Sequence, residues 1–505
     1  MHYTASPPST TIPPPLYGST SISSTVASSM IISSDEEDDN DRLSAFYTIP
    51  GSPTPSMLYG DIPRSKLDPA EATQSKADLQ ALQADRPGYG TSSVFGSSMN
   101  LLNAMMGSGI IGLPLALYLC GFWLGLISAV VVAILTCIAM HLLVLCGIRS
   151  RQYTLGDLCR ACLLGEVGSH IVNFLLFFHT AGTAVSYYIL LGDTVPCLLR
   201  YYVPDVSWLG NRQIIVISFG VLCSLPLTLP RSIAPLAKWS AASVLLLPMV
   251  VLGIFIRLPL YAPSTIELTT TGPTVSAVFR GLSILCLSFG CSQNVLGVYL
   301  SQRDQRPGRF LIASETSIFL GFLINMSFAV LGFLCFGDAV QANVLLNFPE
   351  DDPVINSVRL FLGIFMCFTI PLSIYPCREA LQKLLGLNTH GKIPSTLQHY
   401  LTTLVAFAVI LYLGATLTAL GKVYAVIGGF STTALGILLP GAAYISCFWL
   451  DLIGKSKLTG DSQATLLGEE QVPVKGSWCL MMVASILVVV SFPVMYYAIM
   501  DAFIS

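Results

Sequence analysis

Long apolar segments dominate this chain, and two of them are interrupted by small and polar residues. The first interruption lies within residues 98–114, which read SMNLLNAMMGSGIIGLP, with Gly107-Ser108-Gly109 at the middle of an otherwise membrane-length segment. Unpaired peptide groups cost several kcal/mol in hydrocarbon, so a helix break at this depth persists only where it is buried in protein or lines a cavity. The sequence therefore predicts a membrane-embedded cavity at this position.

Composition places the chain among polytopic membrane proteins. Of its 505 residues, 53% are hydrophobic and only 10% are charged, and the mean hydropathy is +0.70. Apolar runs of about 20 residues, the length that a helix needs to cross a bilayer, predict eleven spans. They lie near residues 97–120, 122–147, 168–199, 212–229, 235–257, 275–300, 309–336, 354–377, 396–420, 423–450 and 477–500.

The distribution of Lys and Arg orients these spans. If the N-terminus is cytosolic, fourteen of the 25 Lys and Arg residues fall in cytosolic loops, six fall on the opposite side or in the spans leading to it, and five fall in the tail. This bias follows the positive-inside rule. We therefore expect a cytosolic N-terminus and, because the number of spans is odd, a C-terminus on the other side.

Residues 1–92 are rich in Ser, Pro and Thr and contain no apolar core, which predicts a disordered cytosolic tail without a signal peptide, followed by a membrane domain at 93–505. The tail contains an acidic run, Ser33–Asp39, with two serines at its start. This run is either a solvated linker or a phosphorylated element that binds cytosolic partners.

The residue content disfavours several other functions. The net charge is −3 and no long basic stretch occurs, so we expect no nucleic-acid partner. Cys159 and Cys162 form a CxxC, but no second pair or histidine couple completes a zinc site. No catalytic constellation is apparent, which indicates a protein that is not an enzyme and uses no cofactor.

The second interruption lies five spans after the first. Residues 288–294 read SFGCSQN within the span at 275–300. Matching breaks in two five-span halves indicate an inverted repeat with a substrate site between the halves, here residues 97–257 and 275–450, with 477–500 outside the repeat. The alternative is that the small residues only let helices approach closely.

The segment from Asn100 to Pro114 resembles the span-one signature of the amino acid/auxin permease family. The likeness continues, in the family's order, at Ser186–Pro196, Gly332–Asn347, Thr369–Arg378 and Gly428–Gly441, and it covers about residues 93–500. Within this family the chain is similar to the sodium-coupled neutral amino acid transporters and to fungal vacuolar amino acid transporters. The resemblance implies an all-α integral membrane fold of eleven helices, a leucine-transporter-type 5+5 inverted repeat plus one helix, and secondary active transport of amino acids.

The two interruptions supply the expected substrate site. Free amides at a helix break attract a carboxylate and freed carbonyls attract a cation, a polarity that suits an amino acid. We expect the substrate to contact Met106, Gly107, Ser108, Gly109, Thr183, Ser186, Gly290, Cys291, Ser292, Gln293 and Asn294. By motif matching, the resemblance implies that Asn103 and Thr369 line a Na⁺ site, with H⁺ as the alternative coupling ion.

One position departs from the family pattern. Relatives often carry a histidine just after the cysteine of span six, whereas here Cys291 is followed by Ser292 and Gln293. The resemblance therefore implies no particular amino acid side chain for the substrate.

Ionisable residues within the predicted spans have two interpretations. Those nearer a span end than the midplane, where pairing or snorkelling satisfies them, are Asp193, Arg280, Glu315 and Arg359. The histidines His141 and His179 titrate near neutral pH, so each is either a proton carrier or a hydrogen-bonded residue between helices.

The sequence thus predicts a cation-coupled symporter of neutral or broad-range amino acids that works in the lipid bilayer by alternating access. The alternative is an amino-acid-sensing receptor that uses the same cavity and signals through its tail. The acidic, Ser-rich tail favours a vacuolar, lysosomal or other endomembrane location, as does the position of the sequon-like triplet Asn325-Met326-Ser327 within a span. The plasma membrane is the alternative.

Overall fold

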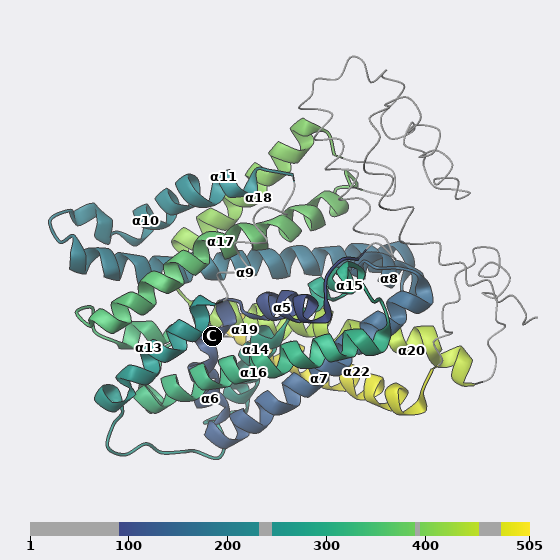
Figure 1. Ribbon diagram of the computed structural model, residues 1–505, viewed down its shortest axis with the longest axis horizontal. Helices are drawn as coiled ribbons and strands as arrows, with labels where there is room; N and C mark the ends of the chain where they lie inside the picture. The colour runs from purple at the N-terminus through teal and green to yellow at the C-terminus, as the bar shows by residue number, and fades with distance from the viewer. Residues whose placement is uncertain (1–89, 232–244, 389–393, 454–475, 505) are drawn as a thin grey trace, which may run out of the picture. The chain divides into compact units, whose positions relative to one another are not determined.

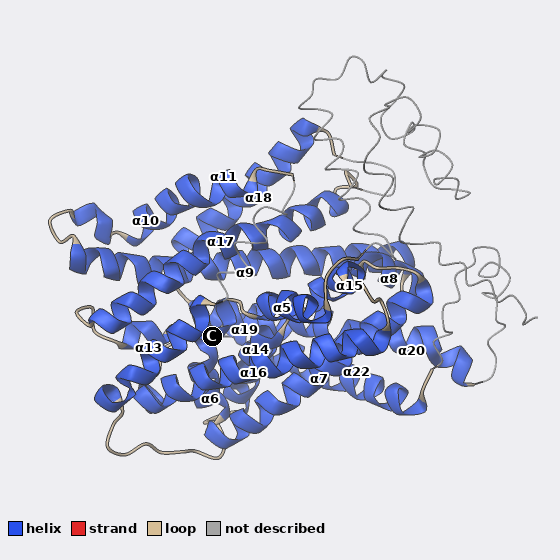
Figure 2. Cartoon of the chain, in the orientation of Figure 1, coloured by secondary structure: helices blue, strands red, loops and turns tan. Residues whose placement is uncertain are grey.

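The computed structural model describes residues 90–231, 245–388, 394–453 and 476–504. Within these ranges the chain is almost entirely helical and forms no strand, apart from one isolated bridge between Ser92 and Gln302 (Figure 2). The expected all-α class is therefore confirmed. Residues 1–89 of the predicted tail and residues 235–244 of the predicted fifth span lie outside the described residues.

The first part of the chain contains two long helices and several short ones. In chain order these are α5 (Val94–Met105), η2 (Ser108–Gly112), α6 (Leu113–Cys120), α7 (Phe122–Ser150), α8 (Leu155–Cys162), α9 (Gly165–Tyr202), η3 (Ser207–Gly210), α10 (Arg212–Phe219), η4 (Gly220–Ser224), α11 (Leu225–Thr228) and α13 (Leu246–Tyr261). Helices α7 and α9 have 29 and 38 residues, which at about 1.5 Å per residue exceeds the thickness of a hydrocarbon core.

The second part of the chain also consists of long and short helices. Its elements are α14 (Val275–Phe289), α15 (Ser292–Ser301), α16 (Pro307–Phe336), η5 (Gly337–Ala339), η6 (Val344–Asn347), α17 (Pro353–Leu384), α18 (Thr396–Thr416), α19 (Leu420–Val426), η7 (Ile427–Thr432), η8 (Ala434–Leu438), α20 (Leu439–Leu452) and α22 (Trp478–Ile504). Helix α19 continues into α20 through the two π-helical stretches η7 and η8.

Eight described helices are long and apolar enough to cross a membrane, and the bent pair Val94–Met105 and Ser108–Cys120 makes a ninth. Two shorter apolar helices, Arg212–Thr228 and Leu246–Tyr261, fall on the predicted fourth and fifth spans. Apolar helix therefore occurs at every predicted segment. The count of eleven and the inverted repeat stay predictions.

Side-chain caps set several helix starts. The side chains of Ser93, Thr274, Asp352 and Ser395 accept hydrogen bonds from first-turn amides of α5, α14, α17 and α18. These amides have no partner within the helix, so a capping oxygen stabilises the start. The caps define where four of the apolar helices begin.

Long continuous helices surround the two interrupted spans. Helices α9 and α17 pack along each other, α16 packs against α5 and α6, and α14 packs against α6 and η7 (Figure 1). The contact between α14 and η7 is close, because a Cβ at Gly428 would lie 1.9 Å from the Ser283 carbonyl oxygen. Only glycine permits this approach.

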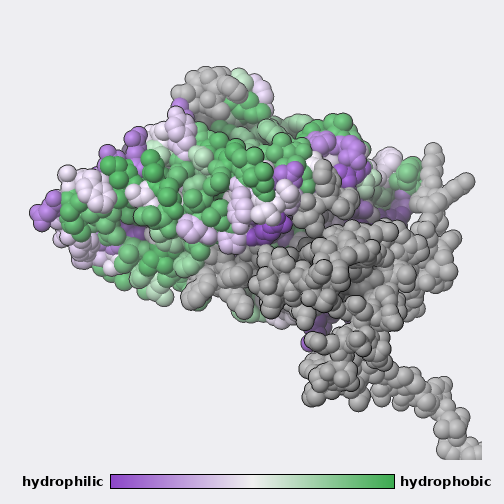
Figure 3. Space-filling view, turned by 90° about the horizontal axis from the view of Figure 1, so that it is seen from above, coloured by the Kyte–Doolittle hydropathy of each residue, from purple (hydrophilic) through white to green (hydrophobic). Residues whose placement is uncertain are grey.

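The outward faces of several helices are apolar. Large exposed apolar side chains include Phe174 on α9, Phe319 on α16, Val409 on α18 and Phe492 on α22. Figure 3 shows hydrophobic residues spread over much of the described face in that view. Extended apolar surface of this kind fits a protein whose neighbours are lipid chains.

Candidate functional site

The first span is broken at the residues that the sequence singles out. Helix α5 ends at Met105, and Met106 and Gly107 leave the helical conformation with ψ angles of 69° and −169°. The chain resumes as η2, and the two parts of the span are bent by 54°. The peptide groups around Ser108 therefore lack the regular partners of a continuous helix.

Side chains from two other segments hold Ser108. Its carbonyl accepts a hydrogen bond of 2.5 Å from the Tyr424 hydroxyl, and its backbone also hydrogen-bonds the Tyr187 hydroxyl. Its own hydroxyl lies 2.5 Å from the hydroxyl of Ser186. All four residues are buried, so the first break forms a buried cluster of hydroxyl groups.

The second break lies between α14 and α15. Gly290 and Cys291 leave the helical conformation, with ψ angles of 114° and 9°. The Ser288 carbonyl accepts a hydrogen bond of 3.1 Å from the Asn325 side-chain amide on α16. Asn325 is fully buried, and its Oδ1 has no hydrogen-bond partner among the residues that the structure describes.

An amide oxygen buried without a partner is unfavourable, because it has lost its hydrogen bonds to water without replacing them. The Oδ1 atom of Asn325 is therefore a place where a bound donor or cation would gain an interaction.

The two breaks lie against each other. A Cβ at Gly109 would come 2.9 Å from the Ser288 hydroxyl and 3.3 Å from its Cα atom. On the other side of the second break, a Cβ at Gly290 would come 2.4 Å from the Thr432 methyl group of η7. Both interruptions thus belong to one buried region, bounded by α9, α16 and the π-helical segment.

The predicted substrate residues have different surroundings. Buried are Met106, Ser108, Gly109, Ser186, Cys291 and Ser292; half-buried are Gly107, Thr183, Gly290 and Gln293; Asn294 is exposed. The Cys291 thiol contacts the Met140 sulfur of α7 at 3.3 Å, and the Thr183 hydroxyl donates within its own helix to the His179 carbonyl. The structure therefore brings Ser108, Gly109 and Ser186 together, while a role in binding stays a prediction for the whole set.

The predicted cation ligands lie on α5 and α17. Asn103 is half-buried, and Thr369 is 8% exposed with its hydroxyl donating to the Phe365 carbonyl of the same helix at 2.9 Å. The Phe365 ring in turn packs edge-on against Tyr187, with ring centroids 6.3 Å apart. Thr369 thus lies one helical turn from Phe365, and Phe365 contacts Tyr187 at the first break. The cation site itself stays a prediction.

Tyr187, Tyr424 and Asn325 lie at the breaks, although the sequence patterns did not indicate them as site residues. The available signal was a hydrogen-bonding side chain deep within an apolar run, which must find a partner there. Thr369 carries the same signal and bonds its own helix. A polar side chain within an apolar run therefore does not by itself distinguish a ligand-binding residue from one that hydrogen-bonds its own helix.

The two intramembrane histidines have different neighbours. His179 is buried, and its Nδ1 lies 3.2 Å from the Thr432 hydroxyl and 3.4 Å from the Ser431 hydroxyl, which places it at the interface of α9 with η7. His141 and Glu315 instead line a mostly apolar cavity of about 560 Å³ between α7 and α16, whose lining includes no residue of either break.

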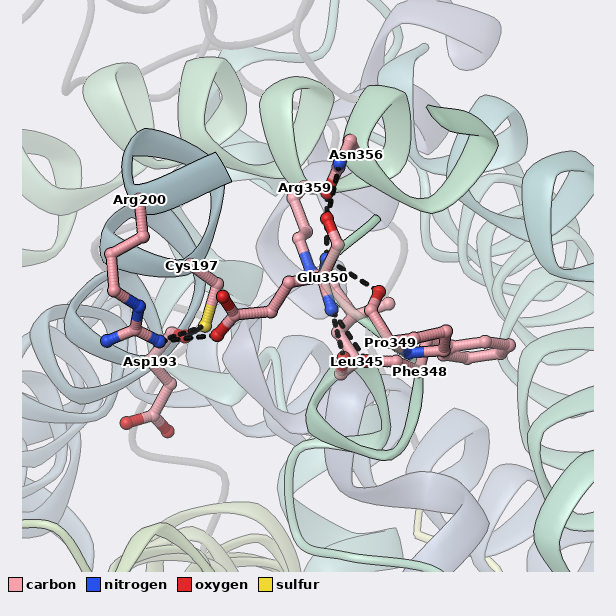
Figure 4. A network of polar contacts seen from close by, with 9 residues as sticks. All are labelled: Asp193, Cys197, Arg200, Leu345, Phe348, Pro349, Glu350, Asn356 and Arg359. Carbon is pink, nitrogen blue, oxygen red and sulfur yellow. Dashed lines mark hydrogen bonds and ion pairs between the residues drawn. The ribbon is translucent and has the colours of Figure 1, made fainter. Parts of the chain in front are cut away.

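A second polar cluster forms hydrogen bonds to the segment between α16 and α17 (Figure 4). We call Arg200, Glu350, Asn356 and Arg359 the loop cluster. Arg359 is 2% exposed and donates to the carbonyls of Leu345, Phe348 and Pro349 and to Asn356 Oδ1. Arg200 of α9 lies 2.5 Å from Glu350, and its hydrogen bond holds the pKa of Glu350 below the ordinary value.

The sequence is similar to those of known proteins. The family model described as transmembrane amino acid transporter protein matches residues 90–467. The chain is 27% identical over 361 residues to vacuolar amino acid transporter 2 of Saccharomyces cerevisiae, covering 68% of this chain and 74% of that protein. It is also 27% identical over 370 residues to putative sodium-coupled neutral amino acid transporter 11 of Danio rerio, covering 70% and 79% respectively.

Among solved structures, the substrate-bound outward-open state of a Na⁺-coupled sialic acid symporter is similar with a TM-score of 0.49 and 13% sequence identity, over 85% of this chain and 96% of that chain.

Proposed function

This chain belongs to the transmembrane amino acid transporter family, and from that premise we propose that it is a symporter that moves neutral or broad-range amino acids together with a cation by alternating access. The family and the relatives are transporters, so the expectation that the protein is not an enzyme is confirmed. The observation that carries the proposal is the buried contact between the two broken spans, where Gly109 meets Ser288.

The proposed architecture has eleven spans. Two inverted five-span repeats comprise about residues 97–257 and 275–450, and a last helix lies at about 477–500. In support, the first span of each proposed repeat is interrupted, one between α5 and η2 and the other between α14 and α15. The bias of Lys and Arg supports a cytosolic N-terminus.

The proposed substrate site lies at the two breaks. Amides of residues 107–109 would receive the substrate carboxylate, as the start of a helix segment favours an anion. The free Oδ1 of Asn325 would accept a hydrogen bond from the substrate ammonium group. Residues 290–293 would then lie beside the substrate side chain.

Tyr187 and Tyr424 have a supporting role in this proposal. Both bond the peptide groups of Ser108 in the structure, so they keep the broken turn open and satisfied without a continuous helix. The buried hydroxyls of Ser108 and Ser186 line the same place and supply further hydrogen-bonding groups.

The proposed cation site comprises Asn103, Thr369 and carbonyls freed by the first break. An amide oxygen, a hydroxyl and peptide carbonyls are neutral oxygen ligands, which suit Na⁺ as a hard cation. The alternative coupling ion is H⁺. The printed name of the Danio rerio relative includes sodium coupling, and that of the yeast relative does not.

We also propose an endomembrane location, vacuolar or lysosomal, which the name of the yeast relative supports. In this arrangement the tail of residues 1–92 lies in the cytosol, where it can bind regulatory partners.

Uptake of radiolabelled amino acids into proteoliposomes tests the function. Purified protein is reconstituted, and uptake is compared under an inward Na⁺ gradient, an inward H⁺ gradient and no gradient. Concentrative uptake under one gradient is expected. Saturable binding without uptake under any gradient would instead identify a receptor and refute the symporter.

Variants of the cation ligands test the site separately. In Asn103→Ala and Thr369→Ala we expect uptake to lose its dependence on the coupling gradient. The matched control is Thr180→Ala, because Thr180 is also a buried threonine that donates within its own helix, to the Leu176 carbonyl at 2.7 Å. Unchanged coupling in both site variants would remove these residues from the site.

A further inference from the structure

Three helices meet at the end of the bundle that bears Arg149, and cysteines from two of them face each other. Cys162 is the last residue of α8, and Cys447 lies on α20. Their sulfur atoms are 2.7 Å apart. The hydroxyl of the adjacent Ser446 donates to the Cys162 carbonyl, and Arg149 of α7 forms an ion pair of 2.9 Å with Asp451 of α20. A third cysteine, Cys146 of α7, also contacts the Cys447 thiol.

We propose that Cys162 and Cys447 are an oxidation site that forms a reversible disulfide between α8 and α20. The S–S bond of a disulfide is about 2.05 Å, so the two sulfur atoms need to approach by less than about 1 Å. We expect rotation of the two cysteine side chains to cover this distance.

The structure selects this pair over the one that the sequence suggests. Cys159 and Cys162 form a CxxC, yet the Cys159 thiol packs against Gly168 of α9, where a Cβ would lie 2.7 Å from its sulfur. The neighbour of Cys162 is Cys447, 285 residues along the chain. The CxxC spacing is therefore incidental to the proposed chemistry.

The reaction uses a peroxide as oxidant. One thiolate attacks a peroxide oxygen, the O–O bond breaks, and a sulfenic acid forms with release of water after proton uptake. The second thiol then attacks that sulfur and expels the hydroxyl group as a second water. Together two thiols and one hydrogen peroxide give one disulfide and two waters, and a dithiol reductant reverses the change.

The surroundings of Cys162 affect how fast its thiol is oxidised. Contact with the Cys447 thiol raises the pKa of the Cys162 thiol, and the thiolate is the reactive form, so the reaction accelerates as pH rises. Both cysteines are half-buried and within reach of a small oxidant. In a reducing cytosol a disulfide of this kind is transient.

The consequence for transport rests on the proposed function. Helix α8 belongs to the first proposed repeat and α20 to the second, so the disulfide joins two halves that must move relative to each other during alternating access. Oxidation is expected to stop uptake reversibly.

Peptide mapping of the full-length protein tests the covalent site without reference to transport. Reduced protein in detergent is treated with hydrogen peroxide at pH 7 and pH 8.5, free thiols are blocked with N-ethylmaleimide, and digests are analysed by mass spectrometry. We expect a linked peptide pair containing Cys162 and Cys447, formed faster at pH 8.5, absent after dithiothreitol, and absent in Cys162→Ser and Cys447→Ser. Cys159→Ser is the matched control and should keep the link.

Two results would overturn the proposal: both thiols remaining available to N-ethylmaleimide after oxidation, or Cys447 linked to Cys146 instead. Uptake in proteoliposomes then tests the consequence. Peroxide should abolish uptake by the wild type and leave Cys162→Ser active, and dithiothreitol should restore the wild type. If the linked protein still transports at the full rate, the proposed arrest of transport is wrong, and if no form transports, the proposed function fails while the peptide map still decides the oxidation site.

Discussion

The region of the two breaks and the centre of the loop cluster, around Arg359, are both buried polar regions, and they use their hydrogen-bonding groups differently. In the loop cluster, Arg359 donates to four oxygen atoms, three of them peptide carbonyls of one short segment. At the breaks, Asn325 bonds the Ser288 carbonyl with its amide nitrogen and leaves its oxygen without a described partner. Complete bonding stabilises one conformation, whereas an unused buried acceptor favours the binding of something else.

The largest expected effect follows from removing the hydrogen bonds of Arg359 in the loop cluster. In Arg359→Met the carbonyls of Leu345, Phe348 and Pro349 lose their donor in a buried place, which costs about 3 kcal/mol or more. We expect a strongly lowered melting temperature of the detergent-solubilised protein and little protein at the membrane. Arg303→Met, at an exposed arginine, is the control. A melting temperature equal to the wild type would show that the loop cluster does not stabilise the fold.

The next effect concerns activity at the breaks. In Gly109→Ala the new methyl group meets the Ser288 hydroxyl at 2.9 Å and forces the two broken spans apart. We expect uptake to fall at least about tenfold, equivalent to about 1.4 kcal/mol, because the proposed substrate site lies at this contact. Gly297→Ala is the matched control, since a Cβ there meets nothing within 4 Å. Equal uptake by the two variants would show that the contact between the breaks is not part of the site.

A smaller effect is expected from the unused acceptor itself. Asn325→Leu keeps a similar volume but removes both Oδ1 and the Nδ2 group that donates to the Ser288 carbonyl. The substrate ammonium would lose one hydrogen bond, worth about 1.5 kcal/mol or more. We expect the KM for amino acid uptake to rise about tenfold. Asn173→Leu is the control, because Asn173 is also buried but contacts Ser169 of its own helix. An unchanged KM in Asn325→Leu would mean that the unused oxygen does not contact the substrate.

The sequence predicted the break positions well and the bonding around them poorly. A Gly-Ser-Gly within an apolar run is a local signal, and helix α5 does end at Met105, just before it. The partners of that break, Tyr187 and Tyr424, lie on segments far along the chain, and their positions depend on how helices pack. Pairing across such separations leaves no periodic pattern in one sequence.

In the loop cluster, too, the sequence does not predict which groups bond each other. Arg359 near a span end predicts pairing in general terms, since a buried guanidinium needs acceptors. Its acceptors are peptide carbonyls, which every residue has, so their identity depends on the path of the segment at 344–350. Cys162 is a further case, because its sulfur faces Cys447 and not its CxxC partner.

The smallest expected effect separates the exposed edge of the loop cluster from its buried centre. The Arg200–Glu350 pair has side chains 49% and 44% exposed, so it contributes about 1 kcal/mol or less. Because the hydrogen bond from Arg200 lowers the pKa of Glu350 below 4.5 in the folded protein, its stabilisation is present above pH 4.5 and is lost as pH falls through the lowered pKa. Melting temperatures of the wild type and Glu350→Gln should therefore differ slightly at pH 7 and converge once the pH falls below the lowered pKa of Glu350. A constant difference across this range would assign the effect to something other than the ion pair, and Asp351→Asn, at the neighbouring exposed carboxylate, controls for general charge effects.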